Sequence, residues 1–199
     1  MYLTASRPDI MFAVCACSRF QVTPKTSHLQ AVKRIFRYLR GKPSLGLWYP
    51  KASNFDLVAY SDSDYAGDNL DRKSTTGGCQ FLGHRLISWQ CKKQTIVGTS
   101  STKAEYVVAA HCCGQVLWIQ NQMLDYGFNF MNTSINIDNE SAICIVKNPV
   151  QHSKTKHIEI RHHFIRDCYD KRLIDVVKIH TDQNVADLLT RGFDVGRFN

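Results

Sequence analysis

The chain has 199 residues, of which 44% are hydrophobic and 21% are charged. These proportions are typical of one globular domain with a core, and they exclude a disordered or collagen-like chain. No apolar run approaches the roughly 18 residues that cross a bilayer, so no membrane partner is expected.

Basic side chains are concentrated at the start of the chain. The formal net charge is +8, and residues 1–50 hold eight basic side chains against one acidic side chain. Residues 51–199 are nearly neutral. This pattern indicates either a polyanionic partner such as nucleic acid or a solvated helix face, and charge alone does not decide between them.

The first fifty residues predict two helices. Pro8 suits the first position of a helix, and Asp9 suits its first turn. Residues 29–39 carry apolar side chains every three or four positions, which is typical of an amphipathic helix. Four basic residues fall largely off this apolar stripe: Lys33, Arg34, Arg37 and Arg40.

From about residue 55, strands and helices are expected to alternate. The predicted strands are residues 55–60, 79–82, 86–90, 94–97, 133–138 and 174–179. The predicted helices are residues 100–126, 140–147, 158–171 and 184–191. A polar loop is expected over residues 61–78. This order predicts an α/β fold, a mixed sheet with helices on its faces.

The chain has eight cysteines, and none of them forms a C-x-x-C pair. They predict free thiols in a reducing compartment rather than a disulfide framework. The N-terminal residues also lack the basic and then apolar pattern of a secretory signal. The expected location is therefore intracellular, in the cytoplasm or the nucleus, and not secreted.

Four acidic residues stand at boundaries of predicted elements: Asp62, Glu105, Asp138 and Asp187. Side chains at such boundaries tend to converge above a sheet. Four converging carboxylates repel one another unless cations lie among them. Mg²⁺ prefers oxygen ligands, and two such ions about 4 Å apart promote phosphodiester hydrolysis.

Each of these acids also has a purely structural interpretation. Asp62 and Asp64 fit Asx turns, and Glu105 fits the last position of a T-x-x-E capping box. Asp138 fits a helix N-cap, and Asp187 fits the first turn of a helix. Taken singly, the structural interpretation is favoured each time, because spacing alone does not show that the four acids meet.

Several motifs follow one another along the chain. They are YSDSDYAGD and DRKSTTG (residues 60–77), SW and KKQ (88–94), SSTKAEY (100–106), DNESA (138–142), NPV, TKH and RHHFIR (148–166), and ADLLT (186–190). In this order they resemble the ribonuclease H domain of copia-type LTR retrotransposon Pol polyproteins. The motifs YLT (2–4), RPDI (7–10) and KRIFRYL (33–39) resemble the end of the same polyprotein's reverse transcriptase.

The resemblance implies a ribonuclease H-like domain over residues 51–199, with a five-stranded mixed sheet flanked by helices. It implies that residues 1–50 are a helical remnant of the reverse transcriptase thumb. It matches the family's catalytic and metal-binding acids to Asp62 rather than Asp64, and to Glu105, Asp138 and Asp187. The implied cofactor is two Mg²⁺ ions, for which Mn²⁺ can substitute. The implied partners are an RNA–DNA hybrid and the remainder of the reverse transcriptase.

Two groups of residues are candidate nucleic-acid contacts. The basic residues of the arm would add affinity that is sensitive to salt. A second group would contact phosphates or 2′-hydroxyls: Arg72, Lys73, Ser74, Thr75 and Thr76. His180 is an auxiliary candidate, because many ribonucleases H carry a catalytic histidine before the last aspartate. Only six residues separate it from Asp187, so that loop is nearly absent here.

The chain also departs from the family pattern. Lys103 replaces a usual Glu at a position that is not a metal ligand, and the polymerase motif Y-x-D-D does not occur. The chain therefore resembles a C-terminal fragment of a polyprotein. The alternative function is a catalytically silent, truncated or host-captured fragment that at most binds nucleic acid or protein. Intact acids argue against this alternative, whereas the missing polymerase half argues for it.

Two other patterns are given less weight. The tetrapeptide RYLR (residues 37–40) matches the R-x-L-R of secreted oomycete effectors, and we interpret the match as chance because no signal peptide precedes it. Zinc is not favoured, since the histidines have no cysteine pair at finger spacing. These histidines are His152, His157, His162 and His163.

Overall fold

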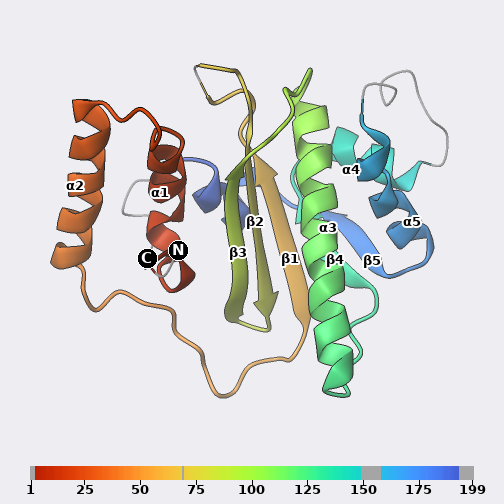
Figure 1. The fold of residues 1–199 in the computed structure, drawn as a ribbon. Coiled ribbons are helices and arrows are strands. Elements are labelled where there is room, and N and C mark those ends of the chain that lie inside the picture. Colours follow the sequence, from red (N-terminus) through yellow and green to blue (C-terminus); the bar gives the residue numbers. More distant parts are fainter. Residues whose placement is uncertain (1–2, 69, 149–157, 193–199) are drawn as a thin grey trace.

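A single mixed sheet of five strands forms the centre of the protein. The computed structural model describes residues 3–68, 70–148 and 158–192. The strands are β1 Leu57–Ser63, β2 Thr75–Leu82, β3 Arg85–Lys93, β4 Thr133–Ile137 and β5 Ile174–Lys178, in the order β3-β2-β1-β4-β5 (Figure 1). Strands β1 to β3 are antiparallel neighbours, whereas β4 runs parallel to β1 and β5 parallel to β4. The mixed five-stranded sheet is therefore confirmed.

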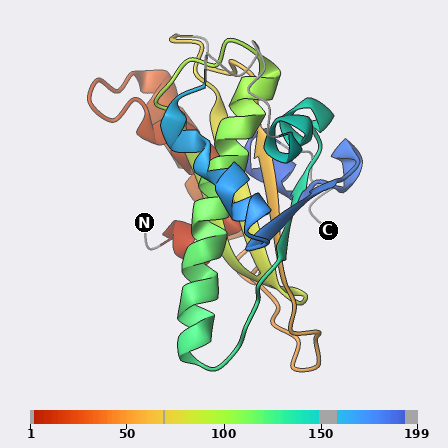
Figure 2. The same cartoon turned by 90° about the vertical axis from the view of Figure 1, so that its right-hand side faces the viewer.

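Helices cover both faces of the sheet. One face carries α3 Ser101–Asp125, α4 Glu140–Lys147 and α5 Phe164–Asp170, and Figure 2 shows α3 and α5 alongside each other. The other face carries α1 Met11–Ser18 and the 3₁₀-helix η6 Val185–Leu189. The remaining helices are α2 Thr26–Gly41, η1 Leu3–Ala5, η2 Pro8–Ile10, η4 Ile160–His162 and η5 Thr181–Gln183. None of the helices in the described ranges is long and apolar enough to cross a bilayer.

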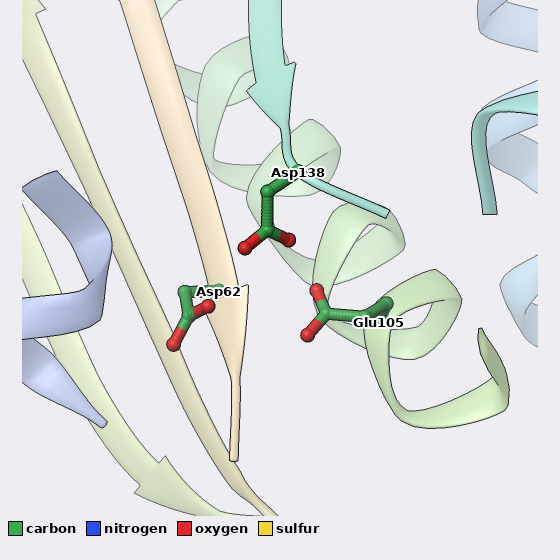
Figure 3. Close-up of side chains that lie close together, drawn as sticks. All are labelled: Asp62, Glu105 and Asp138. Atoms are coloured by element: carbon green, nitrogen blue, oxygen red, sulfur yellow. The ribbon is translucent and has the colours of Figure 1, made fainter. Parts of the chain in front are cut away.

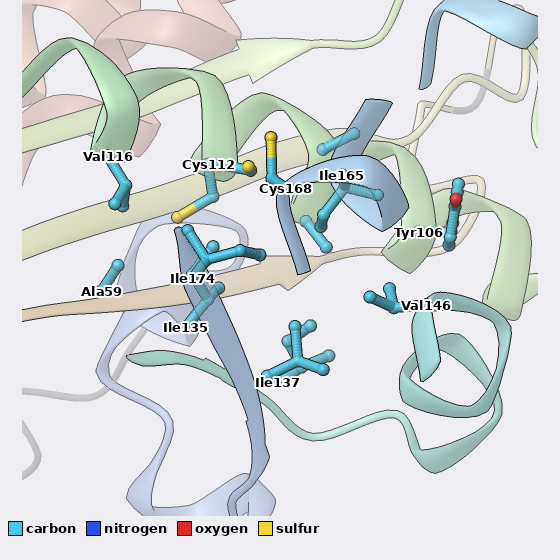
Figure 4. Close-up of a cluster of buried hydrophobic side chains, with 14 of the residues drawn as sticks. Ala59, Tyr106, Cys112, Val116, Ile135, Ile137, Val146, Ile165, Cys168 and Ile174 are labelled. Atoms are coloured by element: carbon cyan, nitrogen blue, oxygen red, sulfur yellow. The ribbon is translucent and has the colours of Figure 1, made fainter. Parts of the chain in front are cut away.

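The main core lies between the sheet and α3 (Figure 4). Ala109, Ala110 and Cys113 of α3 are fully buried, and such small side chains let the helix approach the sheet closely. Ile135 and Val176 face them from β4 and β5. Burying each large aliphatic side chain of this kind contributes about 1.5–3 kcal/mol, which holds the start of α3 firmly beside the ends of β1 and β4.

The N-terminal arm docks on the second face through α1. Arg19 donates to Thr75 Oγ1 at 2.9 Å and pairs with Asp68 at 3.2 Å, and Trp89 Nε1 donates to the carbonyl of Thr4 at 2.9 Å. Helix α2 packs on α1 and lies farther from the sheet (Figure 1). The predicted apolar stripe of α2 forms and is only partly covered: Val32, Ile35 and Leu39 are half-buried, whereas Phe36 is 62% exposed.

Several predicted boundaries were wrong. Residues 94–97 are not a strand, because the side chain of Gln94 turns inward and donates to the carbonyl of Ala104 at 3.2 Å. The predicted loop at 61–78 begins and ends in strand, since β1 continues to Ser63 and β2 begins at Thr75. The helix predicted over 158–171 is divided into η4 and α5, and the last helix is a short 3₁₀-helix. The family motif residues 149–157, with His152 and His157, lie outside the described residues.

Candidate active site

Three of the four candidate acids meet at one edge of the sheet. Asp62 belongs to β1 and Asp138 follows β4, and these neighbouring strands are parallel, so both residues come to the same edge. Glu105 lies in the second turn of α3, which begins at that edge. One carboxylate oxygen from each acid lies within 4.8 Å of the other two, and Figure 3 shows the three side chains turned toward one another.

The structural interpretations of Glu105 and Asp138 are not what the structure shows. Helix α3 is capped by Ser100, whose Oγ accepts from the backbone N–H of Lys103, so Glu105 takes no part in the cap. Helix α4 is capped by Asn139 in the same way. Neither Glu105 nor Asp138 caps a helix, and both side chains point toward Asp62 (Figure 3).

Asp62 is almost fully buried, with 1% of its surface exposed. Its Oδ2 accepts a hydrogen bond from Thr190 Oγ1. Burial is the main cause that raises the pKa of Asp62 to about 6; the Thr190 hydrogen bond opposes the rise, and the negative charges of Asp187 and Asp138 add to it. Asp187 and Asp138 are therefore close enough to Asp62 for their negative charges to disfavour its ionised form.

Glu105 has the more strongly altered carboxyl group. Burial, followed by the charges of Asp62 and Asp138, raises its pKa to about 9. Its Oε1 accepts from the backbone N–H of Ser63 at 3.1 Å, while its Oε2 is buried with no hydrogen-bond partner in the described part of the chain. An unpaired buried oxygen beside two further carboxylates is an all-oxygen donor set, and it fits a hard divalent cation such as Mg²⁺.

Asp187 reaches the same edge from the opposite face of the sheet. It lies on η6, which packs against β1 and β2, and its charge acts on Asp62. Its Oδ1 lies 3.0 Å from Nε of Arg191, and Asp187 is not a member of the group of three oxygens described above. The described structure thus brings three acids close together and places the fourth beside them.

His180 is exposed and engaged within its own turn. Its Nδ1 accepts from the backbone N–H of Asp182 at 3.3 Å, which caps η5. The next residue, Thr181, donates from Oγ1 to Asp138 Oδ2 at 3.2 Å. His180 is therefore the sequence neighbour of Thr181, the residue that contacts Asp138.

The candidate nucleic-acid contacts fall into exposed and buried sets. Ser74 and Thr75 are fully buried and Thr76 is 3% exposed. The hydroxyls of Ser74 and Thr75 accept hydrogen bonds from Ala66 N and Arg19 Nη2. Arg72 is exposed and Lys73 is half-buried, so these two are the accessible members of their group. The four basic residues of α2 are all exposed: Lys33, Arg34, Arg37 and Arg40.

Sequence reasoning missed two residues that contact the acids, Thr190 and Arg191. They follow Asp187 by three and four positions, the spacing at which side chains on one helical turn meet. This spacing was the available signal for Arg191. Nothing in the sequence indicated the contact from Thr190 to Asp62, because it joins residues that are 128 positions apart.

Comparisons with known proteins identify relatives over nearly the whole chain. A retrovirus-related Pol polyprotein from transposon RE1 of Arabidopsis thaliana is 43% identical over 191 residues, which are 96% of this chain and 13% of that protein. The secreted RxLR effector protein 161 of Plasmopara viticola is 40% identical over 60% of this chain and 84% of its own length. The chain spans 13–14% of the length of the curated polyproteins that it matches. No family model matches the chain.

One solved structure is similar to this chain in its fold. A ribonuclease H1 isolated from compost superposes with a TM-score of 0.51 over 68% of this chain and 92% of that protein, at 16% identity. The mixed sheet and its flanking helices therefore form a ribonuclease H fold.

Proposed function

The chain belongs to the family of copia-type retrotransposon Pol polyproteins, and from this premise we propose that it is a metal-dependent endonuclease that cleaves the RNA strand of RNA–DNA hybrids. The observation that carries the proposal is the convergence of Asp62, Glu105 and Asp138 within 4.8 Å on a ribonuclease H fold. In this proposal residues 51–199 are the nuclease domain, and residues 1–50 are a remnant of the reverse transcriptase thumb.

The acids are proposed to hold two Mg²⁺ ions, with Asp187 as the fourth catalytic and metal-binding residue. Divalent ions held among such carboxylates activate a water molecule and stabilise the leaving oxygen of a phosphodiester. The chain's own residues prepare this site. Ser63 fixes one oxygen of Glu105 and leaves the other unpaired, and Thr181 orients Asp138.

Substrate recognition is proposed to rest on shape and charge rather than on base sequence. Ribonucleases of this kind distinguish RNA through 2′-hydroxyls across a wide minor groove. Arg72 and Lys73 are the accessible phosphate contacts near the site, and the basic residues of α2 would add affinity that is sensitive to salt. His180 remains a proposed auxiliary residue near Asp138.

The alternative is a fragment that binds a partner without cutting nucleic acid. One observation favours it: the relative from Plasmopara viticola, of which this chain covers 84%, is named an effector and not a polyprotein. The buried acids argue against it, because a non-catalytic domain gains nothing from keeping mutually repelling carboxylates in its interior.

Hybrid cleavage separates the two functions. End-labelled RNA–DNA hybrid, RNA–RNA duplex and DNA–DNA duplex are incubated with the purified chain in Mg²⁺ or in chelator, and the products are resolved on a denaturing gel. We expect cleavage of the RNA strand of the hybrid alone, and only with Mg²⁺. A folded protein that leaves the hybrid intact would establish the non-cleaving alternative.

A further inference from the structure

We propose that Thr190 is a positioning residue that sets the orientation of the Asp62 carboxylate, an inference that rests on the proposed function. Thr190 is 1% exposed, and its Oγ1 donates to Asp62 Oδ2. The same hydroxyl oxygen lies 3.1 Å from the backbone carbonyl oxygen of Asp187. A threonine hydroxyl has one proton, and the charged carboxylate is the stronger of these two acceptors.

The fold makes room for this contact on the strand next to Asp62. Gly77 is the cross-strand partner of Asp62 in the pairing of β1 with β2. A Cβ atom at Gly77 would lie 2.6 Å from Cγ2 of Thr190 and 2.8 Å from the carbonyl oxygen of Ala186. The missing side chain therefore lets η6 lie directly on the sheet, with the methyl group of Thr190 close to Gly77 and its hydroxyl bonded to Asp62.

Helix η6 is attached to β1 on both sides of Asp187. Before the helix, Asn184 Nδ2 donates to the carbonyl oxygen of Ser61 at 3.0 Å, and its Oδ1 caps the helix at Ala186. After the helix, Thr190 bonds to Asp62, the next residue of β1. The two attachments hold the segment that carries Asp187 in register with the strand that carries Asp62.

Thr190 thus joins two of the proposed metal-binding acids into one unit. Without its hydroxyl, the Asp62 carboxylate loses its buried donor and the end of η6 loses its attachment to β1. Removing an outer-shell partner of this kind typically costs about 10–100-fold in metal affinity or activity.

The test separates the loss of the hydroxyl from a change in the size of the side chain. Thr190→Val replaces the hydroxyl with a methyl group, and Thr190→Ser keeps the hydroxyl and removes the methyl group. Thr133→Val is the matched control, because Thr133 is a buried threonine at the far end of β4 whose hydroxyl donates to Phe130 O. For each protein, Mn²⁺ and Mg²⁺ binding is measured by titration calorimetry, thermal unfolding in chelator is recorded, and kcat and KM are measured on the hybrid.

We expect Thr190→Val to weaken metal binding by about 10–100-fold and to lower kcat with little change in KM. Thr190→Ser should stay within about threefold of wild type, and Thr133→Val should lower the melting temperature without changing metal affinity. If Thr190→Val does not fold, Thr190→Ser and Thr190→Ala make the same comparison, since they differ only in the oxygen.

Two results would overturn the inference: wild-type metal affinity in the variant without the hydroxyl, or equal loss in the Ser and Val variants. Because metal binding is measured without substrate, the outcome does not depend on cleavage. A wild-type protein that binds metal and leaves the hybrid uncut would contradict the proposed function while still deciding the role of Thr190.

Discussion

The backbone N–H of Ser63 donates to Oε1 of Glu105 at 3.1 Å, which joins the end of β1 to the second turn of α3. The other oxygen of Glu105 is buried without a hydrogen-bond partner in the described residues, and it faces the charges of Asp62 and Asp138. This arrangement favours the protonated carboxyl group, so the protonation of Glu105 is linked to folding.

The first prediction concerns stability and pH in the metal-free protein. The pKa of Glu105 is about 9 in the folded chain and near 4.5 in the unfolded chain, so the folded state binds the proton more tightly. Its contribution to stability is complete below about pH 4.5 and is lost as the pH rises through about 9. Glu105→Gln keeps an oxygen for Ser63 and cannot ionise. At pH 8 we expect it to raise the free energy of unfolding by on the order of 1–3 kcal/mol.

The measurement is chemical unfolding of both proteins in chelator between pH 5 and pH 9. The difference in unfolding free energy between variant and wild type should grow with pH. Added Mg²⁺ should stabilise the wild type and reverse this ranking, because bound cations offset the repulsion among the carboxylates. Parallel pH profiles for the two proteins would show that Glu105 is ionised in the folded state, contrary to the expected proton uptake.

A second prediction distinguishes the acids of the site from their neighbour. Asp138→Asn keeps an oxygen for the hydroxyl of Thr181 and removes the charge, so hybrid cleavage should fall at least about a hundredfold with the melting temperature nearly unchanged. Asp64→Asn is the matched control. Asp64 accepts from the backbone N–H of Thr75 and is not in the acidic group, so this variant should keep most of its activity. Equal losses in both variants would point to a general effect of charge.

Much of the fold followed from local pattern. The long helix α3 and the strands β4 and β5 lie close to their predicted positions, because each has a strong periodicity and clear end signals. The predicted start of β2 at residue 79 was wrong for a physical reason, whereas its predicted end at residue 82 was correct. Thr75 to Gly78 look like loop residues. They form strand because they pair with β3 and, from Thr76 onward, with the end of β1, and because η6 and α3 cover β2.

Part of the candidate nucleic-acid interface is also buried in the structure. Ser74, Thr75 and Thr76 have the polar character of phosphate contacts, but all three are buried. Thr75 and Thr76 belong to β2, and the hydroxyl of Ser74 accepts from the backbone N–H of Ala66. The meeting of Asp62 with Asp138 depends on β4 lying beside β1, which the spacing of the two residues does not encode. Resemblance to a family supplied that information, and local chemistry alone did not.

A third prediction concerns the basic residues of α2. The slope of log K against log salt is negative, and removing one basic side chain that contacts a phosphate makes it less steep by about 0.7–0.9. Arg37→Gln and Arg40→Gln should each make the slope of hybrid binding less steep by this amount if both residues contact phosphate. The measurement is fluorescence anisotropy with labelled hybrid in chelator at several salt concentrations. Lys171→Gln is the control, because Lys171 lies at the end of α5 and pairs with Asp167. Unchanged slopes for all three variants would identify α2 as a solvated helix face.

Deleting residues 1–50 would be a less informative experiment. Met11, Phe12 and Cys15 pack against the buried cluster on the second face of the sheet, which includes Cys91 and Leu189. Their removal would expose apolar surface and loosen η6, so reduced binding could come from a damaged fold. Single charge substitutions on α2 leave this packing intact.

The last prediction concerns two adjacent glycines of β2 with opposite environments. A Cβ atom at Gly77 would meet Thr190 and Ala186 at 2.6 and 2.8 Å, whereas at Gly78 the nearest atom would be the carbonyl oxygen of Tyr60 at 3.8 Å. Gly77→Ala should therefore push η6 away from the sheet, destabilise the protein by about 1–3 kcal/mol and weaken Mn²⁺ binding. Gly78→Ala should be neutral or slightly stabilising, because it restricts the unfolded chain without a clash. Thermal unfolding and titration calorimetry on both variants provide the measurement. If the two substitutions have the same effect, close packing of η6 against the strand of Asp62 is not what holds the site together.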